Sequence, residues 1–341
     1  MKIGLFIDSF YPMVDGVINV VDNYAKELLK YAEVTVFCPL VNGVKITDKP
    51  YEVVQCNSFE LKGLEYTLPT PMVDGDFIKK LNKSNLDIVH VHSPFTVGEM
   101  GKNYAKKFNK PLIATLHSQF RQDFERAVKL KTPVDIAMKM IMRIFNSCDV
   151  CWAVNDKIKE LYQTEYGLTA NCIIKQNATS HRPVTDRNSA INEINSLYGL
   201  QSNIPVFLFV GRLNLLKGID LIVDSLKIVK ERGIKFKMLF VGIGQDQDLL
   251  IEKIADLNLS DDIILTGKID DAHLLEKIYA RATLFLFPSK YDANSLVQIE
   301  AACQSTPTLF VKGARTASER IADENGFIAE DNPESYAEKI I

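Results

Sequence analysis

The sequence has no long hydrophobic run and no excess of basic residues. No apolar stretch approaches the ~20 residues that a helix needs to cross a bilayer. The first residues, Met1–Asp8, are too short for a signal peptide and end in an acid, so we expect a buried strand there. Lys and Arg total 40 against 43 Asp and Glu, a net charge of -3, whereas nucleic-acid binders usually show a basic excess. We therefore expect no nucleic-acid partner.

The sequence also lacks the grouped ligands that a metal site requires. Cys148 and Cys151 match C-x-x-C, but a structural zinc needs four ligands and no second pair follows. His90, His92 and His117 end predicted strands, with no carboxylate or cysteine at ligand spacing. The six cysteines are scattered through apolar segments, as is usual for reduced thiols in the cytoplasm. We expect a cytoplasmic protein with no metal and no cofactor.

Three common enzyme signatures are missing. The P-loop pattern G-x-x-x-x-G-K-[ST] and the hydrolase pattern G-x-S-x-G do not occur. Gly242 and Gly244 begin a G-x-G-x-x-G pattern, but Gln247 occupies the third glycine position. These absences argue against a P-loop nucleotidase, an α/β-hydrolase and a dinucleotide-dependent oxidoreductase.

Two series of short apolar runs, alternating with helical patterns, fill the 341 residues, a length that suggests two domains. Continuous apolar runs are typical of parallel strands covered on both faces. The expected strands are Ile3–Ile7, Val34–Cys38, Val53–Gln55, Ile88–Val91, Leu112–Leu116, Val150–Val154, Ile173–Ile174, Val206–Val210, Met238–Val241, Ile263–Leu265, Leu284–Phe287 and Thr308–Phe310. The pattern predicts an α/β protein with two Rossmann-like, doubly wound domains facing a cleft.

A polar break separates the two series. Residues 177–202 carry few large apolar side chains. We expect a first domain at residues 1–180 and a second at residues 200–341. The last residues, Pro333–Ile341, look like a helix cut off after its second turn, so the second domain is expected to be truncated at its C-terminus.

The segment Gly211–Gly218 combines a strand end, a glycine turn and two cations. Ligands of open α/β sheets bind beyond the carboxyl ends of the strands. Arg212 and Lys217 at such an end suit a diphosphate, because arginine can fork and lysine acts as a point charge. Solvated loop charges are the alternative interpretation.

The segment Phe287–Ala302 has a second strand end, followed by a helix expected to begin near Asn294. Asn294 or Ser295 would cap that helix, and its free N–H groups could bind an anion. Glu300 lies in an otherwise apolar helix and needs a partner, which a ribose diol could supply. A solvated or salt-bridged Glu300 is the alternative.

Together these segments resemble the retaining glycosyltransferases of the GT-B fold, in the sucrose-synthase-like family (glycosyltransferase family 4). Gly211–Gly218 resembles the diphosphate-binding motif, and Asp292 to Glu300 resembles the Glu-x7-Glu motif. Tyr11–Val17 resembles the amino-terminal Pro-x-x-Gly-Gly-Val loop, and Thr115–Ser118 resembles the Thr-x-His segment. The similarity spans essentially the whole chain with its motifs in the family order.

The resemblance implies a role for each matching position. The catalytic set would be Asp292, His117, Arg212 and Lys217, with Asp292 at the transferred sugar and His117 near sugar and acceptor. The donor-binding set would be Gly16, Arg212, Lys217, Gly267, Lys268, Asn294, Ser295, Leu296 and Glu300. Within it, Gly16 would approach the distal phosphate, Gly267 and Lys268 would lie along the base, and Glu300 would hold the ribose.

Two positions depart from the family pattern. Asp292 replaces the usual first glutamate and is one methylene shorter, and Asp15 replaces the first glycine of the amino-terminal pair. The expected activity is a metal-independent, retaining transfer of a hexose, with glucose from UDP-glucose as the donor that the resemblance favours, to a lipid or saccharide acceptor. The alternatives are a hydrolytic or epimerising enzyme of the same fold and a sugar-nucleotide-binding protein without transfer activity.

The stretch Arg121–Phe145 carries six basic against three acidic residues, a local charge of +3, with apolar residues interleaved. Pro133 is expected to divide it into two helices. Basic amphipathic helices can lie on anionic membranes, and the chain resembles bacterial diacylglycerol glucosyltransferases. We therefore expect peripheral contact with the inner face of an anionic membrane. Ordinary helices with one solvated basic face are the alternative.

Overall fold

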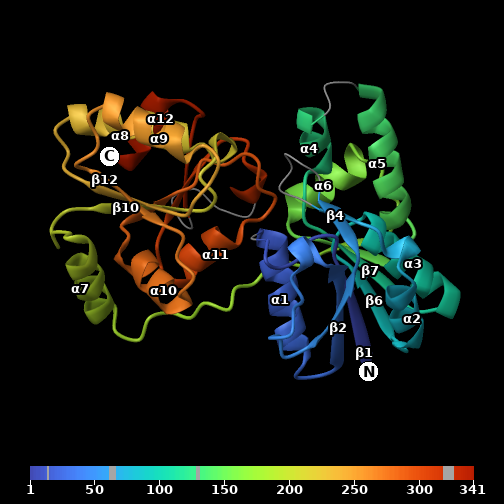
Figure 1. Cartoon of the computed structure of the whole chain (residues 1–341). Coiled ribbons are helices and arrows are strands. Elements are labelled where there is room, and N and C mark those ends of the chain that lie inside the picture. The colour runs from blue at the N-terminus through green and yellow to red at the C-terminus, as the bar shows by residue number, and fades with distance from the viewer. Residues whose placement is uncertain (14, 61–66, 128–130, 318–325) are drawn as a thin grey trace. The chain divides into compact units, whose positions relative to one another are not determined.

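The structure is a computed structural model that describes residues 1–13, 15–60, 67–127, 131–317 and 326–341. The chain forms two compact units, Met1–Asn177 and Ala178–Ile341 (Figure 1). Each unit has one parallel sheet between helices, so the prediction of two doubly wound α/β domains is confirmed. The second unit also contains the helix α7 (Arg187–Tyr198), which lies within the stretch expected to be a polar break.

The first unit is built on a seven-stranded parallel sheet in the order β3-β2-β1-β6-β7-β8-β9. Its strands are β1 (Lys2–Phe6), β2 (Glu33–Pro39), β3 (Glu52–Cys56), β6 (Ile88–Val91), β7 (Leu112–Leu116), β8 (Val150–Ala153) and β9 (Cys172–Ile174). Its helices are α1 (Gly16–Leu28), α2 (Gly75–Lys83), α3 (Thr96–Phe108), α4 (Phe120–Ala127), α5 (Lys131–Phe145) and α6 (Asp156–Thr164). An antiparallel pair, β4 (Ser58–Glu60) and β5 (Thr67–Pro69), was not predicted.

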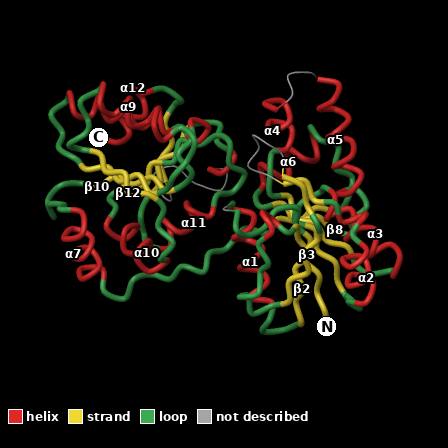
Figure 2. The backbone as a smooth tube through the Cα atoms, viewed as in Figure 1, coloured by secondary structure: helices red, strands yellow, loops and turns green. Residues whose placement is uncertain are grey.

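The second unit has a six-stranded parallel sheet in the order β12-β11-β10-β13-β14-β15. Its strands are β10 (Val206–Val210), β11 (Lys237–Val241), β12 (Ile263–Gly267), β13 (Leu284–Leu286), β14 (Thr308–Val311) and β15 (Gly326–Ala329). Its other helices are α8 (Ile219–Glu231), α9 (Gln247–Asp256), α10 (Ala272–Arg281), α11 (Leu296–Cys303) and α12 (Pro333–Ile340). Figure 2 shows α8, α9 and α12 on one face of this sheet and α7, α10 and α11 on the other.

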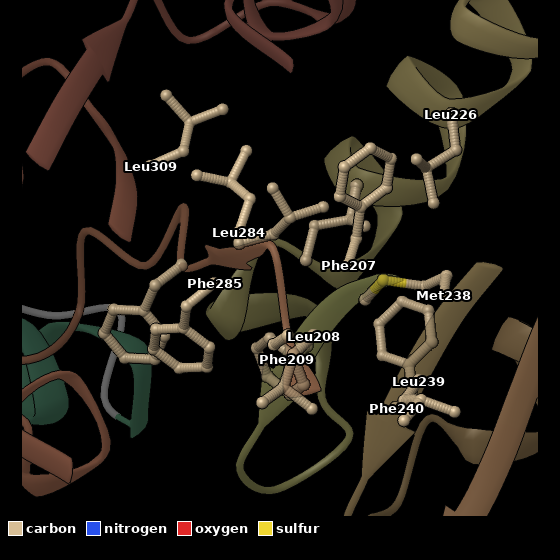
Figure 3. Close-up of a cluster of buried hydrophobic side chains, with 14 of the residues drawn as sticks. Phe207, Leu208, Phe209, Leu226, Met238, Leu239, Phe240, Leu284, Phe285 and Leu309 are labelled. Atoms are coloured by element: carbon tan, nitrogen blue, oxygen red, sulfur yellow. The ribbon is translucent and has the colours of Figure 1, made fainter. Parts of the chain in front are cut away.

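The core of the second unit explains why its strands read as continuous apolar runs. Every residue of β10 is buried, since helices cover both faces of the sheet. Phe207, Leu208 and Phe209 of β10 lie among side chains from β11, β13, β14 and α8 (Figure 3). This dense packing holds the ends of the strands in place, and those ends carry the candidate site.

The order of the strands along the chain reverses at one point of each sheet. In the first unit the order reverses between β1 and β6, and in the second between β10 and β13. Ligands of doubly wound sheets bind at such switch points, outside the carboxyl ends of the strands. The two segments singled out in the sequence, Gly211–Gly218 and Phe287–Ala302, follow β10 and β13 and therefore meet at the second switch point.

The stretch Arg121–Phe145 contains two helices, α4 and α5, as predicted, but Pro133 does not lie between them. It lies in the first turn of α5, where proline is tolerated because the first helical N–H groups have no intrahelical acceptor. Helix α4 ends at Ala127. Val128 and Lys129 lie outside the described residues.

Candidate functional site

The loop after β10 and the loop after β13 pack closely against each other at the switch point. Gly218 has a φ of +71°, and a Cβ atom there would lie 2.8 Å from Cγ of Pro288. Only a glycine accommodates this backbone conformation together with so close a neighbour. The contact brings the turn that carries Lys217 against the loop that follows β13.

Lys217 and Asp292 form a nearly buried ion pair across these loops. The Lys217 ammonium lies 2.6 Å from Oδ1 and 2.7 Å from Oδ2 of Asp292. The hydroxyl of Ser289, which is fully buried, donates to Oδ2 of Asp292 at 2.5 Å. Lys217 also lies 5.5 Å from the ring centroid of Tyr291. The structure thus brings together two of the predicted catalytic residues, 75 positions apart in the sequence.

Arg212 follows directly on the glycine that ends β10. A Cβ on Gly242 would lie 2.0 Å from the carbonyl oxygen of Gly211, so the ends of β10 and β11 touch backbone to backbone. The N–H of Gly211 also donates to the carbonyl of Val241 at 3.0 Å. These contacts fix the point at which Arg212 leaves the sheet, beside the turn that carries Lys217.

Helix α11 begins one to two residues later than predicted, at Leu296. Ser295 occupies the cap position, one of the two residues expected there, but its side chain makes no capping hydrogen bond within the described chain. Instead the Ser295 N–H donates to the hydroxyl of Thr316 at 3.1 Å. A helix start without a side-chain cap keeps its first-turn N–H groups for an anion.

Glu300 lies inside α11, as predicted, and is shielded from solvent. Its Oε2 accepts a hydrogen bond of 3.0 Å from the Tyr279 hydroxyl, and Nε2 of His181 lies 3.9 Å from Oε1. Burial raises the pKa of Glu300, while His181 and Tyr279 act in the opposite direction. A desolvated carboxylate with one oxygen beyond hydrogen-bond distance of its neighbour suits a ligand hydroxyl.

Gly267 and Lys268 occupy the end of β12. Gly267 is the last strand residue and has a φ of +74°. The Lys268 ammonium lies 2.6 Å from Oδ1 of Asp270 in an exposed pair. Both residues therefore lie at the carboxyl edge of the sheet whose strand β10 precedes Lys217.

Gly16 and His117 belong to the first unit. Gly16 is the first residue of α1, and apart from its chain neighbours and the backbone of its own helix no described atom lies within 4 Å of the place a Cβ would take. Asp15 caps this helix, because its carboxylate accepts from the Val17 N–H at 2.8 Å. The acid that replaces the family glycine therefore has a structural role at the α1 N-terminus.

His117 is part of a stack of three imidazoles. Its Nε2 lies 3.0 Å from Nδ1 of His92, and the His92 ring packs against His90 with centroids 4.0 Å apart. His90 Nε2 lies 2.7 Å from the Thr115 hydroxyl. Burial lowers the pKa of His117 to about 3, so His117 is neutral at pH 7. Burial, with the neighbouring imidazoles, also lowers the pKa of His92 well below its ordinary value. His117 would meet a ligand as a neutral hydrogen-bonding group.

Neither a metal-binding cluster nor a membrane-spanning helix is found among the described residues. Within the described ranges, no three His, Cys, Asp or Glu side chains are grouped so that they could hold a metal ion. In that part of the chain no helix is both long enough and apolar enough to pass through a bilayer.

Several residues of the site were not singled out in the sequence. Ser289 lies three positions before Asp292, and its place in that motif is the one signal that could have pointed to it. Tyr279 on α10 and His181 before α7 approach Glu300 from distant positions, and no local pattern marks them. His92 was considered as a metal ligand, whereas the structure shows it as the partner of His117.

Both units match family models. Residues 191–341 match the family described as glycosyl transferases group 1, and residues 14–174 match glycosyltransferase family 4. Two Rossmann-like domains with these matches define the class: the chain is a glycosyltransferase of the GT-B fold.

Individual relatives and structures narrow this class. The chain is 24% identical to alpha-monoglucosyldiacylglycerol synthase of Acholeplasma laidlawii over 91% of its own length and 80% of that protein. It is 27% identical to mannosylfructose-phosphate synthase of Agrobacterium fabrum, over 68% of this chain and 55% of that one. Its fold is similar to sucrose-phosphate synthase of Thermosynechococcus elongatus, with a TM-score of 0.76 and 17% identity over 99% of this chain and 88% of that one. The protein is a hexosyltransferase.

Proposed function

We propose that this hexosyltransferase transfers glucose from UDP-glucose to a lipid hydroxyl, with retention of the anomeric configuration. The second unit would bind the nucleotide sugar and the first the acceptor. The donor is supported by the fold of HepE from Anabaena, solved in complex with UDP-glucose, which matches this chain with a TM-score of 0.75 at 16% identity over 100% of this chain and 88% of that one. The lipid acceptor is supported by the name of the Acholeplasma relative.

The observation that carries the proposal is that the loop with Arg212 and Lys217 and the loop leading into α11 follow neighbouring strands at one switch point. The reaction breaks the bond between the anomeric carbon and a diphosphate oxygen, and that oxygen keeps the electron pair. Fixed cations and N–H groups stabilise the charge that develops there. The acceptor hydroxyl then bonds to the anomeric carbon on the face the diphosphate leaves, and its proton passes to the departing diphosphate.

The other predicted residues take the roles that the resemblance implies. Glu300 would accept hydrogen bonds from the ribose, and Asp292 would contact the transferred glucose. Gly16, with open space at its Cα, would allow close approach of the distal phosphate. His117 would bind the sugar as a neutral imidazole. The backbone of Asn294, Ser295 and Leu296 would assist Asp292 at the transferred sugar, and Gly267 and Lys268 would lie along the base.

An exposed face of α5 supports a lipid acceptor. Ile136 and Met140 are 55% and 63% exposed, although the opposite face of α5 is buried in the unit. Lys139 and Arg143 share the exposed face because they lie three or four residues from Ile136 and Met140. Exposed apolar side chains flanked by cations are the composition of an interfacial helix. We therefore propose that α5 rests on the anionic inner face of the membrane.

Two of the basic residues in this region are paired with acids. Arg121 pairs with Asp135 at 2.9 Å, and Arg143 pairs with Glu99 at 3.2 Å. The side chains of Arg126 and Lys131 are not described, and Lys129 lies outside the described residues. The exposed apolar pair Ile136 and Met140 therefore supports contact of α5 with a membrane more strongly than the net charge does.

The activity is tested with radiolabelled UDP-glucose and diacylglycerol in phosphatidylglycerol vesicles. We expect a glucolipid with an α linkage, identified by thin-layer chromatography and by NMR of the anomeric proton. Release of free glucose without glucolipid would instead favour the hydrolytic alternative. Incorporation into a soluble saccharide, but not into lipid, would overturn the lipid acceptor and leave the transferase.

Membrane contact is tested by flotation. We expect the protein to float with anionic vesicles at low salt, and the double variant Ile136→Ser, Met140→Ser to lose most of this binding. The matched control is Leu249→Ser, Ile251→Ser, which removes two side chains of similar exposure, 54% and 46%, from α9. Equal flotation of both variants would exclude α5 as the contact.

A further inference from the structure

The diphosphate-binding lysine of the proposed site is already occupied by an acid. Both oxygens of Asp292 lie within 2.7 Å of the Lys217 ammonium, and the lysine side chain is nearly buried. Ser289 holds the same carboxylate from the other side. A carboxylate held this close offsets the positive charge of Lys217, so the lysine attracts a more distant anion only weakly.

We propose that Asp292 competes with the diphosphate for Lys217, so that the nucleotide binds more weakly than the cations alone would allow. This inference rests on the proposed function, because it takes Lys217 as a ligand of the diphosphate. A phosphate oxygen at hydrogen-bond distance from the ammonium would lie within about 6 Å of the Asp292 oxygens. At that separation two negative charges repel measurably even at a high effective dielectric constant.

The competition has a consequence for the reaction cycle. When the diphosphate draws Lys217 away, the Asp292 carboxylate loses its cationic partner and becomes available to a hydroxyl of the transferred glucose. When UDP is the product, Asp292 takes Lys217 back and favours release. The shorter side chain of aspartate suits this exchange, since Ser289 and Lys217 hold it close to the loop from which it comes.

The test is the affinity for UDP of the Asp292→Asn variant, measured by isothermal titration calorimetry. Removing the charge should tighten UDP binding about tenfold, within a range of roughly threefold to a hundredfold. The affinity for uridine, which has no phosphate, should stay within twofold. Transfer of glucose should fall in the same variant, so affinity and turnover would change in opposite directions.

Two control variants separate this effect from general changes in charge or packing. Asp292→Glu keeps the charge and should bind UDP within threefold of the wild type. Asp331→Asn removes one acid from an exposed pair with Lys290 of the same loop and should also leave UDP affinity within twofold. Circular dichroism and thermal unfolding check that all three variants fold.

The outcomes distinguish the inference from the proposed function. Unchanged UDP binding by Asp292→Asn would overturn the competition. Weaker binding would also overturn it and would show that Asp292 positions Lys217 for the phosphate instead. Equal tightening by Asp331→Asn would reduce the effect to net charge and would also overturn it. A wild-type protein that binds neither UDP, GDP nor ADP would overturn the proposed function, and the inference with it.

Discussion

Replacement of Glu300 by glutamine tests the nucleotide site most directly. In the structure Oε2 of Glu300 is engaged by Tyr279 at 3.0 Å, whereas the neighbour of Oε1, His181, lies 3.9 Å away. One ribose hydroxyl can therefore donate to a charged, desolvated oxygen. A hydrogen bond to a charged group contributes about 1.5–3 kcal/mol and a neutral one about 0.5–1.5 kcal/mol. Glu300→Gln should weaken the ribose bond by the difference, about 1–1.5 kcal/mol.

The assay is a thermodynamic cycle: the Kd values of wild type and Glu300→Gln for UDP and for 2′-deoxy-UDP are measured by calorimetry. The wild type should prefer UDP over 2′-deoxy-UDP by roughly 10- to 150-fold, which is the same 1.5–3 kcal/mol expressed as a ratio of Kd. In Glu300→Gln this preference should shrink by roughly five- to tenfold. The cycle isolates the contact between Glu300 and the ribose, because other effects of the mutation appear with both ligands.

A matched control is available in the same unit. Glu276 is also a buried glutamate, and its Oε1 accepts from the Arg182 N–H at 2.8 Å, outside the proposed site. Glu276→Gln makes the same chemical change and should leave the preference for UDP at the wild-type value. If Glu300→Gln retains the full preference, Glu300 does not hold the ribose and the assignment is refuted.

Three further predictions concern stability. Excess UDP should raise the free energy of unfolding by about 2.7 kcal/mol at a UDP concentration of a hundred times Kd. The increase, measured by thermal shift, should be the same with and without EDTA, and its loss in EDTA would contradict metal-free binding. Gly218→Ala should lower the free energy of unfolding, measured in urea, by about 1–3 kcal/mol, because residue 218 has a φ of +71° and lies against Pro288. An unchanged urea midpoint would contradict this. Burial raises the pKa of Glu300 above its ordinary value of 4.5, so the folded state holds the Glu300 proton more tightly than the unfolded state does. As pH rises above 4.5, the free energy of unfolding of the wild type should therefore fall relative to that of Glu300→Gln. A constant difference between the two proteins from pH 4 to pH 8 would contradict this.

Much of the fold was predictable because its signals are local. Twelve expected strands correspond to strands of the two parallel sheets, since helices on both faces force the strands to be apolar along their whole length. The exceptions have weak local signals. β15 starts with a glycine, has four residues and lies at the edge of the described sheet, beside β14. Helix α7 packs few large side chains, so its segment reads as a polar break.

The candidate site was predictable as a set of positions and unpredictable as a set of contacts. Gly211–Gly218 and Asp292 to Glu300 were recognisable because strand ends, glycine turns and a family pattern are all properties of neighbouring residues. The role of Asp15 was not, since only the structure shows its carboxylate turned to the Val17 N–H as a helix cap.

The sequence by itself determined the alternation of strands and helices, and hence the parallel sheets and the charged segments that follow their strands. Only the tertiary structure decided which charges meet there. Lys217 and Asp292 come together because Gly218 packs against Pro288, and Glu300 meets Tyr279 because α10 and α11 lie side by side on one face of the sheet. Such pairings depend on a few ångströms of loop and helix placement, which arise from packing across the whole unit and leave no trace in the residues next to them.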